Sequence, residues 1–257
     1  MKKRGAVILI LIFSLLSIQV SYAAKETLKQ KITKADQAFD KWTYKRAVMY
    51  YKEILDVEKN NYYATCRISE AYLNLGFLLH EDKEDAKEKN YALAVKYAKQ
   101  AIKIDPNKAE AHVRLASSVG RLAMFKGGRD KVEMSKQVKT EAELAVKLDP
   151  KNNIAYHILG AWHREVATLG GLLKMFAKIL YGGLPDASVE KSETYFKKAI
   201  ALKPSNIETH IELGKTYEEL DKEDLAAKEY KKAISLPEEQ GYDAKLKKEA
   251  KELLEDL

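Results

Sequence analysis

Residues 207–237 read IETHIELGKTYEELDKEDLAAKEYKKAISLP, and this stretch decides the fold. It carries Leu-Gly-x2-Tyr in its first half and Ala-x3-Tyr-x2-Ala in its second half, both at helical spacing. Gly214 and Ala226 have too little bulk to hold two helices apart, and Tyr217 and Tyr230 can fill the groove beside them. The stretch therefore predicts a helix, a turn and a second helix that packs closely against the first.

The second half of this unit recurs upstream. It appears as YALAVKYAKQAIKIDPNK at residues 91–108, EAELAVKLDPKN at 141–152 and YFKKAIALKPSN at 195–206, with a degenerate first copy at 46–61. Pro106, Pro150 and Pro204 are predicted to end their helices, because proline cannot continue a helix. Helix–turn–helix units of about 34 residues are the tetratricopeptide pattern. Five such units predict an all-α helical-repeat solenoid with residues 242–257 as a C-terminal capping helix.

Three repeats are longer than the pattern requires. The extra residues, 80–90, 123–135 and 168–188, are predicted to lie between the two helices of their repeats, along one edge of the solenoid. The third insertion is apolar, and its predicted surface consists of Leu172, Leu173, Met175, Phe176, Ile179 and Tyr181. Two interpretations stay open: the segment packs on its own solenoid, or it forms a lid or a partner surface. The sequence YGGLP at residues 181–185 should end the segment, so that Asp186 or Ser188 caps the next helix.

The N-terminal residues have the pattern of an export signal. Lys2, Lys3 and Arg4 precede an uncharged run over residues 6–20, and small residues at Ser21 and Ala23 predict cleavage after Ala23. The alternative is an uncleaved membrane anchor, since the apolar run could just span a bilayer. In both cases residues 24–257 are expected to form a single exported solenoid. It would be periplasmic or secreted, in a bacterium, if the signal is cleaved, and tethered to the membrane if it is not.

The net charge argues against nucleic-acid binding, and the cysteine count excludes a fold held by intramolecular disulfides. The net charge of +7 falls to +4 without residues 1–23, which carry three positive charges and no negative one. So small an excess, spread over alternating Lys and Glu, predicts no nucleic-acid partner. Cys66 is the only cysteine, so no intramolecular disulfide is possible and a small buried hydrophobic role is expected.

The sequence offers no starting point for catalysis. It contains no HExxH, paired CxxC, EF-hand loop, Walker phosphate loop, GxSxG or GxGxxG motif. The acidic residues sit at helical spacing from lysines and predict solvated helix faces. We therefore expect no metal, no cofactor and no enzymatic activity.

Binding residues are predicted on the inner surface, which the first helix of each tetratricopeptide repeat lines. The helical register assigns the following residues to this groove: Asn74, Arg121, His157, Arg164, Glu165, Lys215 and Glu218. Arg121 and Arg164 could hold a carboxylate bidentately, as a peptide terminus or an acidic ligand would require. Trp162 is expected to pack in the core.

Residues 157–202 resemble a known family. Leu159-Gly160-Ala161-Trp162, the apolar stretch at 175–181, the Gly/Pro turn at 182–185, Ala187-Ser188 and the repeat helix at 195–201 are similar to the regulator of microtubule dynamics proteins and their exported bacterial relatives. The resemblance implies a tetratricopeptide-like helical domain and no catalytic residue. It does not carry microtubule association to an exported protein. A second likeness is to periplasmic helical-repeat subunits associated with some substrate-binding transporters.

Together these patterns predict a non-catalytic exported scaffold that binds a protein or peptide partner. One alternative is a membrane-tethered scaffold held by an uncleaved residue 6–20 helix. Another is a periplasmic carrier of small ligands, associated with a transporter, whose apolar insertion closes over a pocket.

Overall fold

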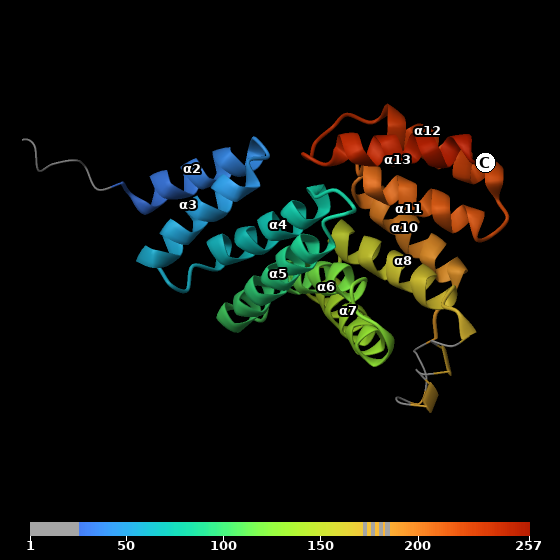
Figure 1. Cartoon of the computed structure of the whole chain (residues 1–257), viewed down its shortest axis with the longest axis horizontal. Helices are drawn as coiled ribbons and strands as arrows, with labels where there is room; N and C mark the ends of the chain where they lie inside the picture. The colour runs from blue at the N-terminus through green and yellow to red at the C-terminus, as the bar shows by residue number, and fades with distance from the viewer. Residues whose placement is uncertain (1–25, 172–173, 176–177, 180–181, 183–185) are drawn as a thin grey trace, which may run out of the picture.

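A computed structural model describes residues 26–257 except 172–173, 176–177, 180–181 and 183–185. Its described residues form helices and connecting turns, with no strand among them (Figure 1). The helices are α2 (Leu28–Asp40), α3 (Tyr44–Val57), α4 (Tyr62–Leu78), α5 (Glu84–Ile104), α6 (Ala109–Ala123), α7 (Gly128–Leu148), α8 (Asn153–Ala167), α10 (Val189–Leu202), α11 (Ile207–Glu218), α12 (Glu223–Ser235) and α13 (Asp243–Glu255).

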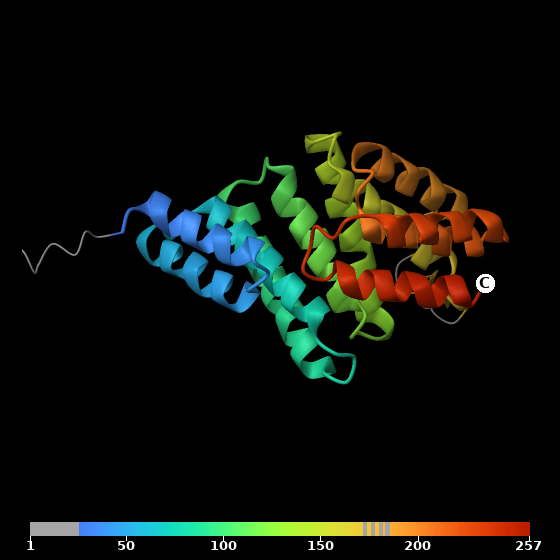
Figure 2. The same ribbon diagram turned by 90° about the horizontal axis from the view of Figure 1, so that it is seen from above.

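The helices pack in sequence order as a curved array. The pairs are α2 with α3, α4 with α5, α6 with α7, α8 with α10 and α11 with α12, and each pair packs on the next. Helix α13 packs on α12 and α11, and Figures 1 and 2 show it at the end of the array. The predicted all-α solenoid is confirmed. The second helices α5, α7 and α10 each end two residues before a proline, as predicted.

Glycines let the two helices of a repeat approach closely, as the pattern predicts. A Cβ atom added at Gly160 would lie 2.8 Å from Cδ1 of Phe196, whose side chain is fully buried. At Gly76 an added Cβ would lie 2.5 Å from Cε1 of Tyr91, and at Gly214 it would collide with the ring of Tyr230. Each aromatic ring therefore occupies the space that a larger residue would need.

Asparagines fix the start of three first helices. The side chain of Asn61 accepts a hydrogen bond from Ala64 N (2.8 Å), and Asn152 and Asn206 cap α8 and α11 in the same way. Ser188 caps α10 by accepting from Lys191 N at 3.2 Å, which confirms one of the two predicted caps. These caps satisfy amide groups that the first turn of a helix leaves without partners.

The extra residues of the second and third repeats lie mostly inside their second helices. Only residues 79–83 and 124–127 form turns, and α5 and α7 are each lengthened to 21 residues. Both inserted sequences lack proline, and the residues that follow the turns, including those after Gly127 and Gly128, are compatible with helix, so they extend α5 and α7. Lys87 and Val132, in these extensions, are buried.

The apolar insertion of the fourth repeat is described only in part. Met175 and Ile179 have exposed fractions of 49% and 70%. The predicted surface residues Leu172, Leu173, Phe176 and Tyr181 lie outside the described residues. Whether the segment packs on the solenoid or meets a partner therefore stays a prediction.

The signal peptide and the membrane anchor also stay predictions, because residues 1–25 lie outside the described part. Among the helices of the described ranges, none has both the length and the apolar content needed to cross a bilayer.

Candidate functional site

The first helices of successive repeats meet along the inner side of the array. Helix α4 contacts α6, α6 contacts α8, and α8 contacts α11. The side chains that link them are largely charged, and they form ion pairs between helices that are distant in the sequence. This arrangement makes the inner face of α4, α6, α8 and α11 the candidate site.

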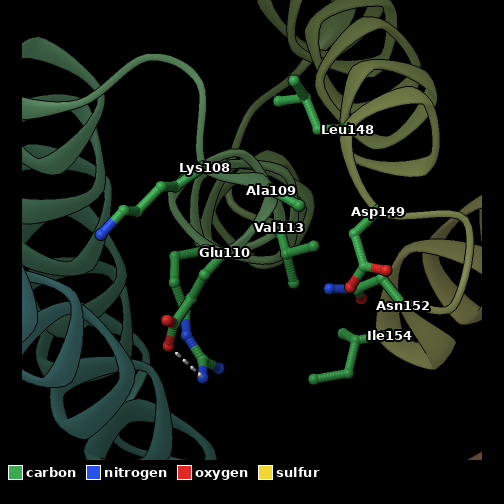
Figure 3. Close-up of a pocket in the computed structure, with 9 residues that line it drawn as sticks. Lys108, Ala109, Glu110, Val113, Leu148, Asp149, Asn152 and Ile154 are labelled. Atoms are coloured by element: carbon green, nitrogen blue, oxygen red, sulfur yellow. Dashed lines mark hydrogen bonds and ion pairs between the residues drawn. The ribbon is translucent and has the colours of Figure 1, made fainter.

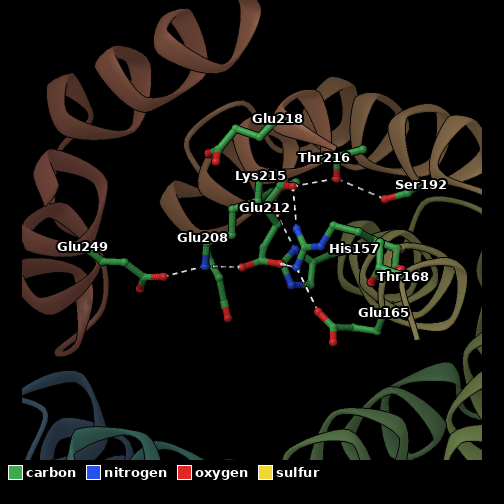
Figure 4. A network of polar contacts seen from close by, with 12 residues as sticks. His157, Glu165, Thr168, Ser192, Glu208, Glu212, Lys215, Thr216, Glu218 and Glu249 are labelled. Carbon is green, nitrogen blue, oxygen red and sulfur yellow. Dashed lines mark hydrogen bonds and ion pairs between the residues drawn. The ribbon is translucent and has the colours of Figure 1, made fainter. Parts of the chain in front are cut away.

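Arg164 and Glu212 lie at the centre of the network that connects α8 to α11 (Figure 4). Arg164 is buried, and it donates from Nη1 to the backbone carbonyl oxygen of Glu212 (2.9 Å) and from Nη2 to the Glu212 carboxylate. Its Nη2 also lies 3.2 Å from Oε1 of Glu165. Burial alone would raise the pKa of Glu212, but the positive charges of Arg164 and Lys215 outweigh it and lower that pKa to about 2.

Lys215 extends this network to the capping helix. Its Nζ donates to Glu212 Oε1 at 3.2 Å and to Glu249 Oε1, on α13, at 2.6 Å. Burial lowers the pKa of Lys215, but the two carboxylates outweigh this and leave it above its ordinary value. Both groups of the pair therefore stay charged at neutral pH.

His157 completes the α8 side of the network. Its Nδ1 lies 2.9 Å from Oγ1 of Thr209, and its ring centroid is 5.5 Å from that of Phe196. On α11, Thr216 Oγ1 donates to the carbonyl oxygen of Glu212 (2.8 Å) and shares a buried hydrogen bond of 3.1 Å with Ser192 of α10. The polar groups of this face are thus held by one another in a fixed arrangement.

Arg121 connects α6 to the start of α11. Its guanidinium pairs with the carboxylate of Glu208 and lies over the ring of Phe77, 4.9 Å from the centroid. The negative charge of Glu208 outweighs the desolvation that would lower the pKa of Arg121, so this pKa is raised. A cation stacked on an aromatic ring and paired with a carboxylate is restricted in its motion.

A second group of charges lies nearer the N-terminal end. Arg114 Nη2, on α6, lies 2.9 Å from Glu70 Oε2, on α4, and 3.3 Å from Glu110 Oε1. Arg67 shares the same carboxylate at 2.7 Å and lies 3.6 Å over the ring of Phe39. The ion pairs therefore continue along the first helices towards the start of the array.

Beside Arg114 an open cleft of about 430 Å³ separates the starts of α6 and α8 (Figure 3). Apolar side chains of Val113, Leu148 and Ile154 lie among polar ones of both charges. The lining residues are Lys108, Ala109, Glu110, Val113, Arg114, Leu148, Asp149, Asn152 and Ile154. This mixture favours no single class of small ligand.

The structure brings five of the seven predicted groove residues to one face. Arg121, His157, Arg164, Glu165 and Lys215 lie along α6, α8 and α11, linked directly or through Glu208, Glu212 and Thr209. The two arginines that were expected to be available for a ligand carboxylate each pair with a glutamate of α11 instead.

The other two predicted residues lie elsewhere. Asn74 is buried on α4 beside the hydroxyl of Tyr44. Glu218 is exposed at the end of α11 and accepts a hydrogen bond from the hydroxyl of Tyr230. Trp162 and Cys66 lie in the core, as expected, and Trp162 Nε1 donates to the carbonyl oxygen of Ser135 at 2.8 Å.

Sequence reasoning missed the acidic half of the site. Glu208 and Glu212 stand four residues apart and precede Lys215 by seven and three residues. This spacing places all three on one side of a helix, which was the available signal. No such sequence signal exists for Glu249, because its partner Lys215 lies 34 residues away. Within the described residues, no group of His, Cys, Asp and Glu has the arrangement of a metal site.

Comparison with known proteins identifies relatives that align with most of this chain. Regulator of microtubule dynamics protein 1 of Bos taurus is 29% identical over 205 residues, which cover 79% of this chain and 63% of the bovine protein. Regulator of microtubule dynamics protein 3 of Mus musculus is 29% identical over 189 residues, covering 73% of this chain and 40% of the mouse protein. The aligned region thus spans less than two thirds of either relative.

A solved structure supports the fold. A thermophilic TPR protein of Thermus thermophilus superposes with a TM-score of 0.64 at 17% identity, covering 89% of this chain and 99% of that one. This likeness concerns the fold alone. The family model of regulator of microtubule dynamics protein 1-3 matches residues 31–257, which confirms the resemblance seen in the repeats. The chain belongs to the regulator of microtubule dynamics protein 1-3 family.

Proposed function

We propose that this protein is a non-catalytic scaffold that binds a protein or peptide partner on the inner face of its helical array. The observation that carries this proposal is the network of Arg121, Arg164 and Lys215 with the glutamates of α11. It displays charges of both signs on a rigid, extended surface, and helical-repeat proteins use such curved surfaces for recognition.

The pairing suggests how a partner would bind. A carboxylate of the partner would share Arg121 with Glu208, since a guanidinium carries five N–H donors and Glu208 does not use them all. Arg164 donates to both a carbonyl and a carboxylate of Glu212, so its role is to hold α8 and α11 together. Arg121, whose side chain is more accessible, is the better candidate for direct contact.

A charge-swap experiment tests this assignment. Peptides are selected from a random phage-displayed library on the full chain and then measured against Arg121→Glu and against the double variant Arg121→Glu/Glu208→Arg. We expect both variants to lose binding, although the double variant restores an internal ion pair. If the double variant binds like the unchanged protein, the pair has only a structural role. If the single variant retains binding, the inner-face assignment is refuted.

We also propose that the scaffold is exported, with the signal peptide removed after Ala23. The supporting observation is the basic, apolar and small-residue order of residues 1–23. Mass spectrometry of the natural protein should find Ala24 as the first residue. An intact N-terminus in the membrane fraction would favour the tethered scaffold instead. The small-ligand carrier stays a prediction, because it depends on an insertion that lies largely outside the described residues.

A further inference from the structure

The C-terminal end of the array returns to its N-terminal end. After α12, residues 236–242 lead back towards the first repeats, and the start of α13 lies beside the end of α4 (Figures 1 and 2). At Gly241 the approach is so close that an added Cβ would lie 2.7 Å from Cβ and Cγ of Trp42, in the turn between α2 and α3. A solenoid repeat ordinarily contacts only its neighbours, so this contact between ends needs a separate explanation.

Trp42 is an unusual residue for its position. Its φ of 59° lies in the left-handed region, which bulky side chains rarely adopt. The corresponding turn between α11 and α12 uses Asp221, with a φ of 54°, and aspartate tolerates this conformation better. The Trp42 side chain is 44% exposed, so burial alone does not account for a tryptophan here. Its close contact with Gly241, made through Cβ and Cγ, leaves room only for glycine at position 241.

Phe77, near the end of α4, receives two side chains of the returning segment. The ring of Tyr242 packs on it edge to face, with centroids 5.1 Å apart. Lys245 Nζ lies 5.0 Å from the centroid of the same ring and donates to the Phe77 carbonyl oxygen at 3.3 Å. The last carbonyls of a helix lack helical partners and attract cations.

Glu81 completes the contact with Lys245. Its Oε1 lies 2.9 Å from Lys245 Nζ, while its other oxygen pairs with Lys87. Asp243 shapes the segment by accepting hydrogen bonds from Glu239 N (2.7 Å) and Gln240 N (2.8 Å). The segment thus offers an aromatic ring and, three residues later, a cation, to a surface made of Trp42, Phe77 and Glu81. We call this the Phe77 surface.

We propose that the Phe77 surface recognises a peptide segment carrying an aromatic residue followed three residues later by a basic one, and that residues 241–245 of this chain occupy it as an internal competitor. The proposal rests on the proposed scaffold function and states what regulates it. A segment tethered in the same chain acts at an effective concentration in the millimolar range. An external peptide of the same chemistry must therefore displace residues 241–245. The internal segment thus weakens the apparent affinity of the Phe77 surface for such a peptide.

The test uses the full chain and a fluorescent peptide of residues 237–250, followed by fluorescence anisotropy. Tyr242→Ala/Lys245→Glu should loosen residues 241–245, since it removes the ring that packs on Phe77 and places a carboxylate beside Glu81, and we expect the peptide to bind this double variant at least tenfold more tightly than the unchanged chain. Lys248→Glu is the matched control, because Lys248 lies on the same helix and, among the described residues, forms its ion pair with Glu252 of its own α13. Equal affinity for the two variants would overturn the proposal.

A reciprocal charge swap tests the chemistry of recognition. Glu81→Lys in the protein should open the contact as well, but should reverse the preference towards a peptide carrying Lys245→Glu. Tyr242→Ala serves as a second opened variant, and circular dichroism verifies that each variant is folded. If neither variant distinguishes the two peptides, recognition by Glu81 is refuted. This experiment leaves Arg121 and Glu208 unchanged, so its failure is distinguishable from failure of the scaffold assignment.

Discussion

Mild acidification should destabilise this protein through one histidine. His163, on α8, is 4% exposed, and its Nδ1 is buried without a hydrogen-bond partner in the described structure. Its ring lies between Trp162 (centroids 5.0 Å apart) and Tyr195 of α10 (5.2 Å). Burial, and then the positive charges of Lys191 and Lys139, lower the pKa of His163 from 6.5 to about 4.

The sign and size of the effect follow from this difference. As the pH falls below about 6.5, His163 takes up a proton in the unfolded chain but not in the folded one, so the unfolded state is favoured. Each unit of pKa difference corresponds to about 1.4 kcal/mol of free energy. From about pH 6.5 to about pH 5 the free energy of unfolding should fall by about 2 kcal/mol, and by about 3 kcal/mol once pH 4 is reached.

The measurement is urea unfolding, followed by circular dichroism, over this pH range. Carboxylates that titrate in the same interval contribute equally to the protein and to its variants, so the difference between His163→Gln and the unchanged chain isolates the histidine. We expect the variant to lose the additional slope. His80→Gln, which removes a histidine whose side chain is 84% exposed, is the matched control and should keep the additional slope that His163 produces. Parallel curves for His163→Gln and the unchanged chain would refute the reasoning.

Two further predictions concern the fold. Gly160→Ala should destabilise the protein by about 1–3 kcal/mol, because the new methyl group meets the buried ring of Phe196. Gly120→Ala, whose Cβ would lie at an ordinary 3.7 Å from its nearest neighbour, should cost little, and equal losses in thermal unfolding would contradict the packing argument. Asn152→Ala should cost about 1 kcal/mol through the lost cap of α8. The control Asn153→Ala lies inside the helix, and an equal loss there would show that capping is not the cause.

The sequence predicted the repeats because their determinants are local. A glycine in one helix opposite an aromatic ring in the next, as at Gly160 and Phe196, recurs in three repeats, and a proline follows α5, α7, α10 and α12. The extra residues of the second and third repeats were harder to place, because a proline-free inserted sequence is compatible with both a loop and a longer helix. Only packing decided this, through buried side chains such as Val132.

The basic residues of the site were predicted but their acidic partners were not, because the two members of each ion pair are distant in the sequence. The helical register assigned Arg121 and Arg164 to the inner face. Their partners Glu208 and Glu212 lie 87 and 48 residues further along the chain. Which arginine meets which glutamate depends on the curvature of the whole array. No local pattern contains that curvature, so the sequence could not show that the two arginines already have carboxylate partners.

The return of the C-terminus to Phe77 has a consequence for how the protein folds. Lys245 and the Phe77 carbonyl are separated by 168 residues, the kind of contact that raises contact order and slows folding. In an array whose ends do not touch, the terminal repeats can unfold independently of each other. Here unfolding of α13 would also expose Phe77 on α4, because Tyr242 and Lys245 pack on it. During synthesis, the first two repeats are made long before the residues that complete them. Phe77 therefore lacks this cover until the last helix has been made.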